Sequence, residues 1–156
     1  MLVPEPERAA REIRRVLRPG GRAAIAVWGP RERNPWLSVV FKAVGEQLGM
    51  PVPPPNIPGP FSLDDADVFA GVLTAAGLAG VEVTEVPVPL RAASAEQWSS
   101  RVAALAGPMA KLLASLPPEA AKELRGRLEH AARRYVSARG LEFPGVALVA
   151  GATRTA

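Results

Sequence analysis

The chain has 156 residues, a length that suits one domain, and apolar residues make up 48% of it, enough to form a buried core. It has no cysteine and one histidine, so disulfides, thiolate metal sites and multi-histidine metal sites are excluded within one chain. The net charge is +4, but basic and acidic residues are interleaved, so we do not expect a nucleic acid as partner. The sequence has no apolar run of membrane-spanning length and no recognisable signal peptide. We therefore expect a cytoplasmic protein that does not bind a membrane.

The first predicted element is a helix over residues 4–18, because apolar residues recur there at helical spacing. Pro19-Gly20-Gly21 ends it, since proline cannot continue a helix and glycine can adopt a left-handed backbone. An uninterrupted apolar run then extends from Ala23 to Trp28. Such a run is typical of a strand that is covered on both faces, as in parallel sheets.

Two further helices are predicted from their start signals. Asn34 can cap a helix that has Pro35 at its first position and ends at Gly49. Ser62 and Asp65 resemble a capping box, which predicts that the next helix begins directly after them.

Two strands follow from residue patterns in the second half of the chain. Residues from Val81 to Val86 alternate between apolar and polar, which predicts a half-buried strand. The apolar stretch from Val146 to Ala152 is the last predicted strand. Together these elements predict a single domain over residues 1–156, with residues 94–139 as a helical cap inserted between the two strands.

The insertion is predicted to consist of helices alone. Ser94 and Gln97 form a capping box, and Met109–Leu116 suits a short helix of one or two turns. Pro117-Pro118 opens the longest predicted helix, which runs through about Ala138.

The stretch RVLRPGGR, with a helix before it and an apolar strand after it, resembles class I S-adenosylmethionine-dependent methyltransferases. In that family a turn of the form R-x-L-[KR]-P-G-G joins the fourth helix to the fifth strand. FSLDDADVFAGVLTAAGLAGVEVTEV is similar to the family's sixth strand and the helix before it, and the final strand is similar to the seventh. The resemblance implies an α/β fold: an incomplete, Rossmann-like sheet of three strands in the order fifth, seventh, sixth, with a helical insertion.

The same resemblance implies that the family's cofactor site is missing. In the family, a glycine-rich turn after the first strand approaches S-adenosylmethionine, and no G-x-G-x-G or G-x-G-x-x-G occurs in this chain. We expect the C-terminal half of a methyltransferase, inactive alone and without bound cofactor, arising from truncation, a mis-called start, gene decay or a split protein. Two alternatives remain open: a self-associating or partner-binding module, and a small-ligand binder with a pocket under residues 94–139.

Three residues near the end of the first strand are candidates for binding a small-molecule methyl acceptor: Trp28, Asn34 and Trp36. In open α/β sheets, ligands bind at the carboxyl ends of strands. The alternative, which we favour, is that both tryptophans belong to the core and that Asn34 caps a helix. No catalytic residue is identified.

Other polar residues have simpler explanations than a binding site. Asp64, Asp65 and Asp67 suit the first turn of a helix better than a cation site. His130 lies on the polar side of its helix, which favours a solvated histidine over a general base.

The strand from Ala23 to Val27 is expected to join two copies of the chain. In the implied strand order it becomes an edge, and no proline, lysine or inward charge protects it. The sequence therefore predicts a homodimer through this strand.

Overall fold

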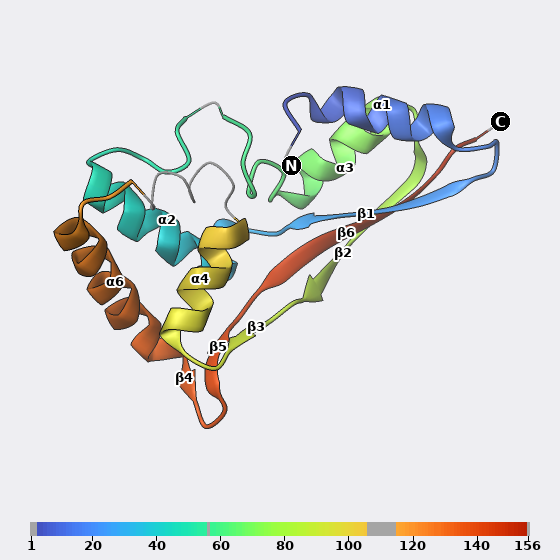
Figure 1. Cartoon of the computed structure of the whole chain (residues 1–156). Helices are drawn as coiled ribbons and strands as arrows, with labels where there is room; N and C mark the ends of the chain where they lie inside the picture. The colour runs from blue at the N-terminus through green and yellow to red at the C-terminus, as the bar shows by residue number, and fades with distance from the viewer. Residues whose placement is uncertain (1–2, 56, 106–114, 156) are drawn as a thin grey trace. The chain divides into compact units, whose positions relative to one another are not determined.

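The computed structural model describes residues 3–55, 57–105 and 115–155, and Figure 1 shows their helices and strands. The chain divides into two compact units. The first unit comprises Met1–Asn34, Asn56–Val88 and Val146–Ala156, and the second comprises Pro35–Pro55 and Pro89–Gly145. The predicted insertion at 94–139 lies inside the second unit, which also takes in an additional helix and short strands.

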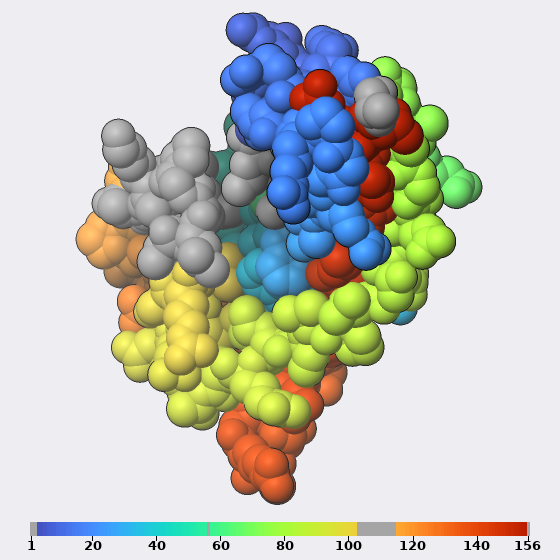
Figure 2. All heavy atoms as spheres, turned by 90° about the vertical axis from the view of Figure 1, so that its right-hand side faces the viewer, coloured from blue at the N-terminus to red at the C-terminus, as the bar shows by residue number. Residues whose placement is uncertain are grey.

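The first unit contains a three-stranded sheet. Its described elements are α1 (Pro6–Val16), β1 (Arg22–Trp28), η1 (Arg31–Arg33), α3 (Ala66–Ala75), β2 (Ala79–Pro87) and β6 (Val146–Thr153). The strand order is β1-β6-β2, and β6 is antiparallel to both neighbours. Figure 2 shows the red C-terminal residues between the blue residues near β1 and the green residues of β2. The last strand of the chain is therefore the central strand of this sheet.

One face of this sheet forms the core of the first unit. Alternate strand residues, among them Val27, Leu148 and Ala150, cluster with Phe69 and Leu73 of α3. Both Phe69 and Leu148 are only 1% exposed. Ala10 of α1 joins the same cluster, so both helices of this unit cover the same face of the sheet.

The opposite face of β1 is open. Arg22, Ala24 and Ala26 are exposed and alternate with more buried residues along the strand. The prediction that the apolar run is covered on both faces is therefore wrong for the described residues. It failed because alanine is tolerated equally on open and covered faces, so a run of alanines does not reveal which of the two is present.

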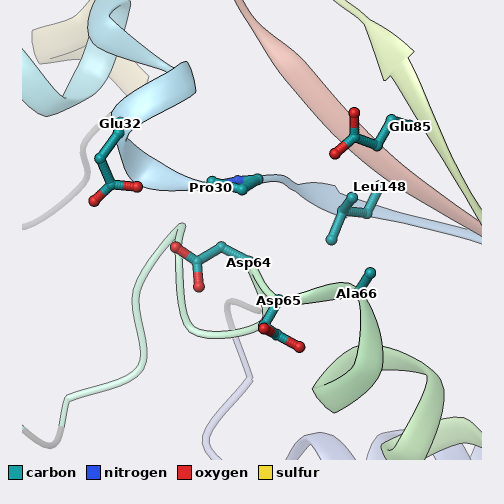
Figure 3. Close-up of a pocket in the computed structure, with 7 residues that line it drawn as sticks. All are labelled: Pro30, Glu32, Asp64, Asp65, Ala66, Glu85 and Leu148. Atoms are coloured by element: carbon teal, nitrogen blue, oxygen red, sulfur yellow. The ribbon is translucent and has the colours of Figure 1, made fainter.

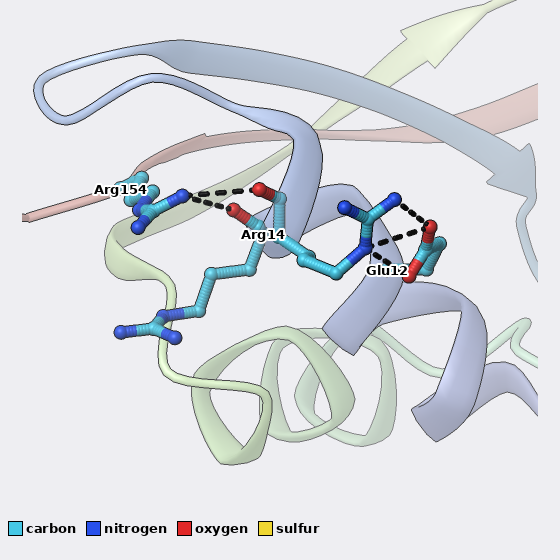
Figure 4. Close-up of polar contacts among 4 residues, drawn as sticks. Glu12, Arg14 and Arg154 are labelled. Carbon is cyan, nitrogen blue, oxygen red and sulfur yellow. Dashed lines mark hydrogen bonds and ion pairs between the residues drawn. The ribbon is translucent and has the colours of Figure 1, made fainter.

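Arg154 joins the end of β6 to the end of α1. Its backbone N–H donates to the Gly21 carbonyl at 2.9 Å, and its own carbonyl accepts from the Gly20 N–H at 2.8 Å. Its guanidinium Nη1 donates to three carbonyl oxygens of the last helical turn and the residues after it, those of Arg14 (3.3 Å), Arg15 (3.1 Å) and Leu17 (2.7 Å). Figure 4 shows this contact. A cation at a helix C-terminus satisfies carbonyls that have no partner within the helix.

The second unit combines helices with a small sheet. Its described elements are α2 (Pro35–Leu48), β3 (Leu90–Ala92), α4 (Ala95–Leu105), α6 (Pro118–Ala132), η2 (Arg133–Tyr135), β4 (Val136–Ser137) and β5 (Gly140–Phe143). The strands are antiparallel in the order β3-β5-β4. Trp98 and Phe143 are both 0% exposed, and their ring centroids lie 4.6 Å apart at the centre of this core.

One of the two predicted capping boxes is confirmed. The Ser94 hydroxyl accepts from the Gln97 N–H at 3.1 Å, and the Gln97 side chain accepts from the Ala93 N–H at 2.8 Å, directly before α4. The box expected at Ser62 is wrong, because Asp65 caps α3 by accepting from the N–H groups of the second and third residues after it, at 2.9 Å each. The Ser62 hydroxyl instead accepts from the Gly59 N–H at 2.7 Å.

The prediction of helices alone over residues 94–139 is wrong at its end. The long helix stops at Ala132, and β4 and β5 then form a hairpin. Tyr135 packs on Phe143 with ring centroids 4.5 Å apart, and Gly140 adopts a φ of 105°, so aromatic packing and a left-handed turn outweigh continuation of the helix. The expected helix at Met109–Leu116 lies almost entirely outside the described residues.

We expect the variant Arg154→Met to lower the free energy of unfolding by about 2 kcal/mol, because charge-assisted hydrogen bonds to the end of α1 are lost. Urea unfolding followed by circular dichroism measures this change. Arg11→Met, at an exposed position of the same helix, is the matched control and is expected to change it by less than about 0.5 kcal/mol. Equal effects of the two variants would contradict the capping role of Arg154.

Candidate functional site

Asn34 is a fully buried polar residue at the end of the loop that follows β1. Its side-chain Nδ2 donates to the carbonyl oxygens of Gly29 (3.1 Å), Pro30 (3.1 Å) and Val146 (3.0 Å). Its Oδ1 accepts from the Val146 N–H at 3.1 Å. Asn34 is 0% exposed, so water cannot satisfy its side chain, and these hydrogen bonds satisfy both the side chain and the backbone groups that it contacts. The side chain therefore joins two segments that are 112 residues apart in the sequence.

Gly29 makes this junction possible. Its N–H donates to the Val146 carbonyl at 2.9 Å, and a Cβ at this position would overlap with the Val146 side chain. Only glycine allows the backbone of the loop to approach the start of β6 so closely. The glycine directly after β1 thus serves packing against β6 and leaves no open backbone for a ligand there.

The three candidate acceptor-binding residues do not form one cluster within a single unit. Trp28 belongs to β1, lies opposite Ala147 of β6 and is half-buried. Trp36 belongs to the second unit, is 5% exposed, and its carbonyl accepts from the Trp98 indole N–H at 2.8 Å. These contacts account for Asn34 and Trp36 as structural residues, and contact of any of the three with an acceptor stays a prediction.

A pocket of about 260 Å³ lies beyond the carboxyl end of β1, within the first unit. Figure 3 shows the residues that line it, which are Pro30, Glu32, Asp64, Asp65, Ala66, Glu85 and Leu148. None of them belongs to residues 94–139, under which the small-ligand alternative placed its pocket. The lining combines a small apolar surface with four carboxyl groups.

Three of these carboxylates already have partners in the protein. Asp64 accepts from the Arg31 backbone N–H at 3.3 Å, and Glu85 pairs with Arg33 at 2.6 Å. The third, Asp65, is the cap of α3. Four carboxylates in one lining make it acidic, which disfavours anionic ligands. Carboxyl groups are the reactive side chains of this lining, so it can bind or orient a polar or cationic group.

Sequence reasoning singled out Asp64 and Asp65 but missed Glu32 and Glu85. Glu85 could have been found, because it occupies the position of the alternating strand where Val81 and Val83 set the apolar face. A charge at the next position of that face indicates that the core ends there. Glu32 lies in η1, and the residues around it show no alternation of apolar and polar positions that would have indicated its place.

The other polar candidates lie on exposed surface. His130 is exposed on α6. Within the part of the chain that the structure describes, no group of three or more histidine, aspartate or glutamate side chains could hold a metal ion. No described helix has the length and apolar character needed to cross a lipid bilayer.

Comparison with known proteins gave one kind of match. No protein-family model and no curated protein matches the chain. Among solved structures, the chain is similar to phospholethanolamine N-methyltransferase 2 of Haemonchus contortus, in a complex with phosphomonomethylethanolamine and S-adenosylhomocysteine. The sequence identity is 14% and the TM-score is 0.44, over 99% of this chain and 31% of that chain. The chain therefore spans less than a third of the length of that protein.

We expect Asn34→Ala to lower the free energy of unfolding by about 3 kcal/mol, because the buried Val146 N–H loses its acceptor and three carbonyl oxygens lose a donor. Asn34→Asp is expected to be at least as destabilising at neutral pH, because a buried carboxylate would face three carbonyl oxygens. Urea unfolding measures both, with Thr84→Ala on exposed β2 surface as control. Unchanged stability of both Asn34 variants would contradict the structural role and favour a role in ligand contact.

Proposed function

We propose that this chain is the C-terminal, acceptor-side part of an S-adenosylmethionine-dependent methyltransferase and has no activity alone. The observation that carries the proposal is the strand order β1-β6-β2 in a unit that contains the RVLRPGGR turn. The resemblance of the sequence implies the order fifth, seventh, sixth for the same three segments. Agreement between a local motif and a long-range strand order supports the proposal, because the two are independent properties of the chain.

The turn itself has the structure that the proposal requires. Helix α1 ends at Val16, Gly20 adopts a φ of 73°, and the chain then enters β1. Helix α3 similarly ends shortly before Gly77, which has a φ of 83°, and leads into β2. Both helix-to-strand connections therefore depend on glycine in a left-handed conformation.

The position of the acidic pocket is compatible with an acceptor site. It lies at the carboxyl end of β1, and ligands in open α/β sheets bind at that end of the strands. The proposal assigns this pocket to the methyl acceptor. Catalysis in such an enzyme consists mainly of holding two reactants together, so a pocket that only holds the acceptor is sufficient.

The residues of this chain do not fit the cofactor. The resembling family approaches the cofactor with a glycine-rich turn, and no G-x-G-x-G or G-x-G-x-x-G occurs in this sequence. The N–H groups at the start of α3 already bind the Asp65 side chain, so they are not open to a ligand. No reaction step through the cofactor is derived from this chain, and S-adenosylmethionine is implied only for a longer protein.

We expect the 156-residue chain not to bind S-adenosylmethionine with a Kd of about 10 μM or tighter, which corresponds to about −7 kcal/mol. Titration calorimetry with the purified protein measures this. A second experiment examines the coding sequence upstream of Met1. An in-frame extension with a glycine-rich strand-turn-helix is expected to confer cofactor binding on the extended protein.

Two results would overturn the proposal. Binding at about 10 μM by the chain alone would show that its own residues form a cofactor site. An in-frame extension that lacks a glycine-rich turn would contradict the proposal that this chain is part of a methyltransferase. So would an extension that does not bind the cofactor when it is expressed with the chain.

A further inference from the structure

Two segments of the chain pass between the units in matching register. In the first unit, β2 is antiparallel to β6, and Pro87 lies opposite Val146. In the second unit, β3 is antiparallel to β5, and Leu90 lies opposite Phe143. Two residues separate these pairs on each segment, so the register is the same on both sides of the boundary. The segments therefore form one antiparallel ribbon that is interrupted where it passes from unit to unit.

The interruption contains two prolines and a glycine. Its residues are Val88 and Pro89 on one segment, and Pro144 and Gly145 on the other. Proline fixes φ at about −65°, whereas an antiparallel strand prefers a φ of about −140°. Pro89 and Pro144 occupy facing positions of the shared register, so both segments leave strand geometry at the same place. Gly145 adds a residue with few backbone restrictions beside them.

A third passage of the chain leaves the first unit at the same place. The chain crosses to the second unit directly after Asn34, whose Oδ1 accepts from the Val146 N–H at 3.1 Å. Three of the four passages between the units are thus gathered beside Val146 within the first unit. The fourth lies in residues 49–65, whose described part contains no helix or strand. Passages gathered at one point allow one unit to rotate without stretching the chain.

We propose that residues 88–89 and 144–145 form a hinge, about which the second unit moves as a body relative to the first. Each unit keeps its own core during this movement, with Phe69 buried in the first and Trp98 in the second. A hinge needs only a few residues that absorb changes in φ and ψ. All hinge residues lie after position 87, so the hinge depends neither on chain that precedes Met1 nor on the methyltransferase proposal.

The acidic pocket borders this hinge within the first unit. Glu85 lies two residues before Pro87 on β2, and Leu148 lies two residues after Val146 on β6. Both residues line the pocket, so a movement at the hinge acts on strand ends that shape it. The hinge is therefore placed to couple the orientation of the second unit to the pocket.

Distances between spin labels measure the movement, and the absence of cysteine lets engineered cysteines carry the labels at chosen positions alone. Arg11→Cys with Arg125→Cys places one label on an exposed position of each unit. Arg11→Cys with Thr84→Cys, and Lys42→Cys with Arg125→Cys, keep both labels within one unit and are the matched controls. Double electron–electron resonance is expected to give a distance distribution about twice as wide for the first pair as for either control.

The double variant Pro89→Val and Pro144→Val tests where the hinge lies. Valine favours strand geometry, so the ribbon is expected to continue across the boundary and the distribution between the units to narrow to the width of the controls. Pro87→Val changes a proline inside β2 and is the matched control, expected to leave that distribution wide. Circular dichroism confirms that each variant is folded.

Nuclear magnetic resonance relaxation dispersion of the wild type gives a readout that needs no variant. The amide groups of Glu85 and Leu148 are expected to exchange between two environments on the μs–ms timescale, and that of Ile13 in α1 is not. Three results would each overturn the proposal: a wild-type distribution between the units as narrow as the controls, a wide one that the double valine variant leaves unchanged, or no exchange at Glu85 and Leu148.

Discussion

The hydrogen bonds between Asn34 and Val146 are the constraint on which the arrangement of the first unit depends. The chain first leaves this unit after Asn34 and returns to it for the last time at Val146, so the residue pair joins the first exit to the last return. Both residues are buried, and a buried amide without its partner is costly. The glycine at position 29 belongs to the same constraint, because any side chain there would collide with Val146. A polar residue that sequence reasoning offered as a ligand contact is thus first a structural one.

The open face of β1 follows from where the helices of the first unit lie. Both helices of the first unit cover the same side of the sheet, and β6 occupies only one edge of β1. The strand that looked most buried in the sequence therefore has alternate residues exposed, whereas β6 is the most covered strand of this sheet in the described structure. Alanine-rich sequence makes this possible, because small apolar side chains cost little when they face water.

The acidic pocket illustrates how local structural roles limit functional interpretation. Asp65 is placed by its role as the cap of α3, and Glu85 by its pair with Arg33. These roles explain the positions of the carboxyl groups without any ligand. What the pocket adds is a location, at the carboxyl end of β1, where the proposed methyltransferase would hold its acceptor. Chemistry would then come from the proximity of the reactants.

The sequence by itself determined the elements that local patterns encode. Helices α1 and α2, the capping box before α4, and the strands β1, β2 and β6 all follow from periodicity, caps and turn residues that lie next to one another in the chain. Tertiary structure decided the rest. It decided that Asp65 rather than Ser62 caps α3, that aromatic packing on Phe143 ends the long helix early, and that β1 has one covered face. It also decided that Asn34 binds Val146, because a hydrogen bond across 112 residues leaves no pattern among neighbouring residues.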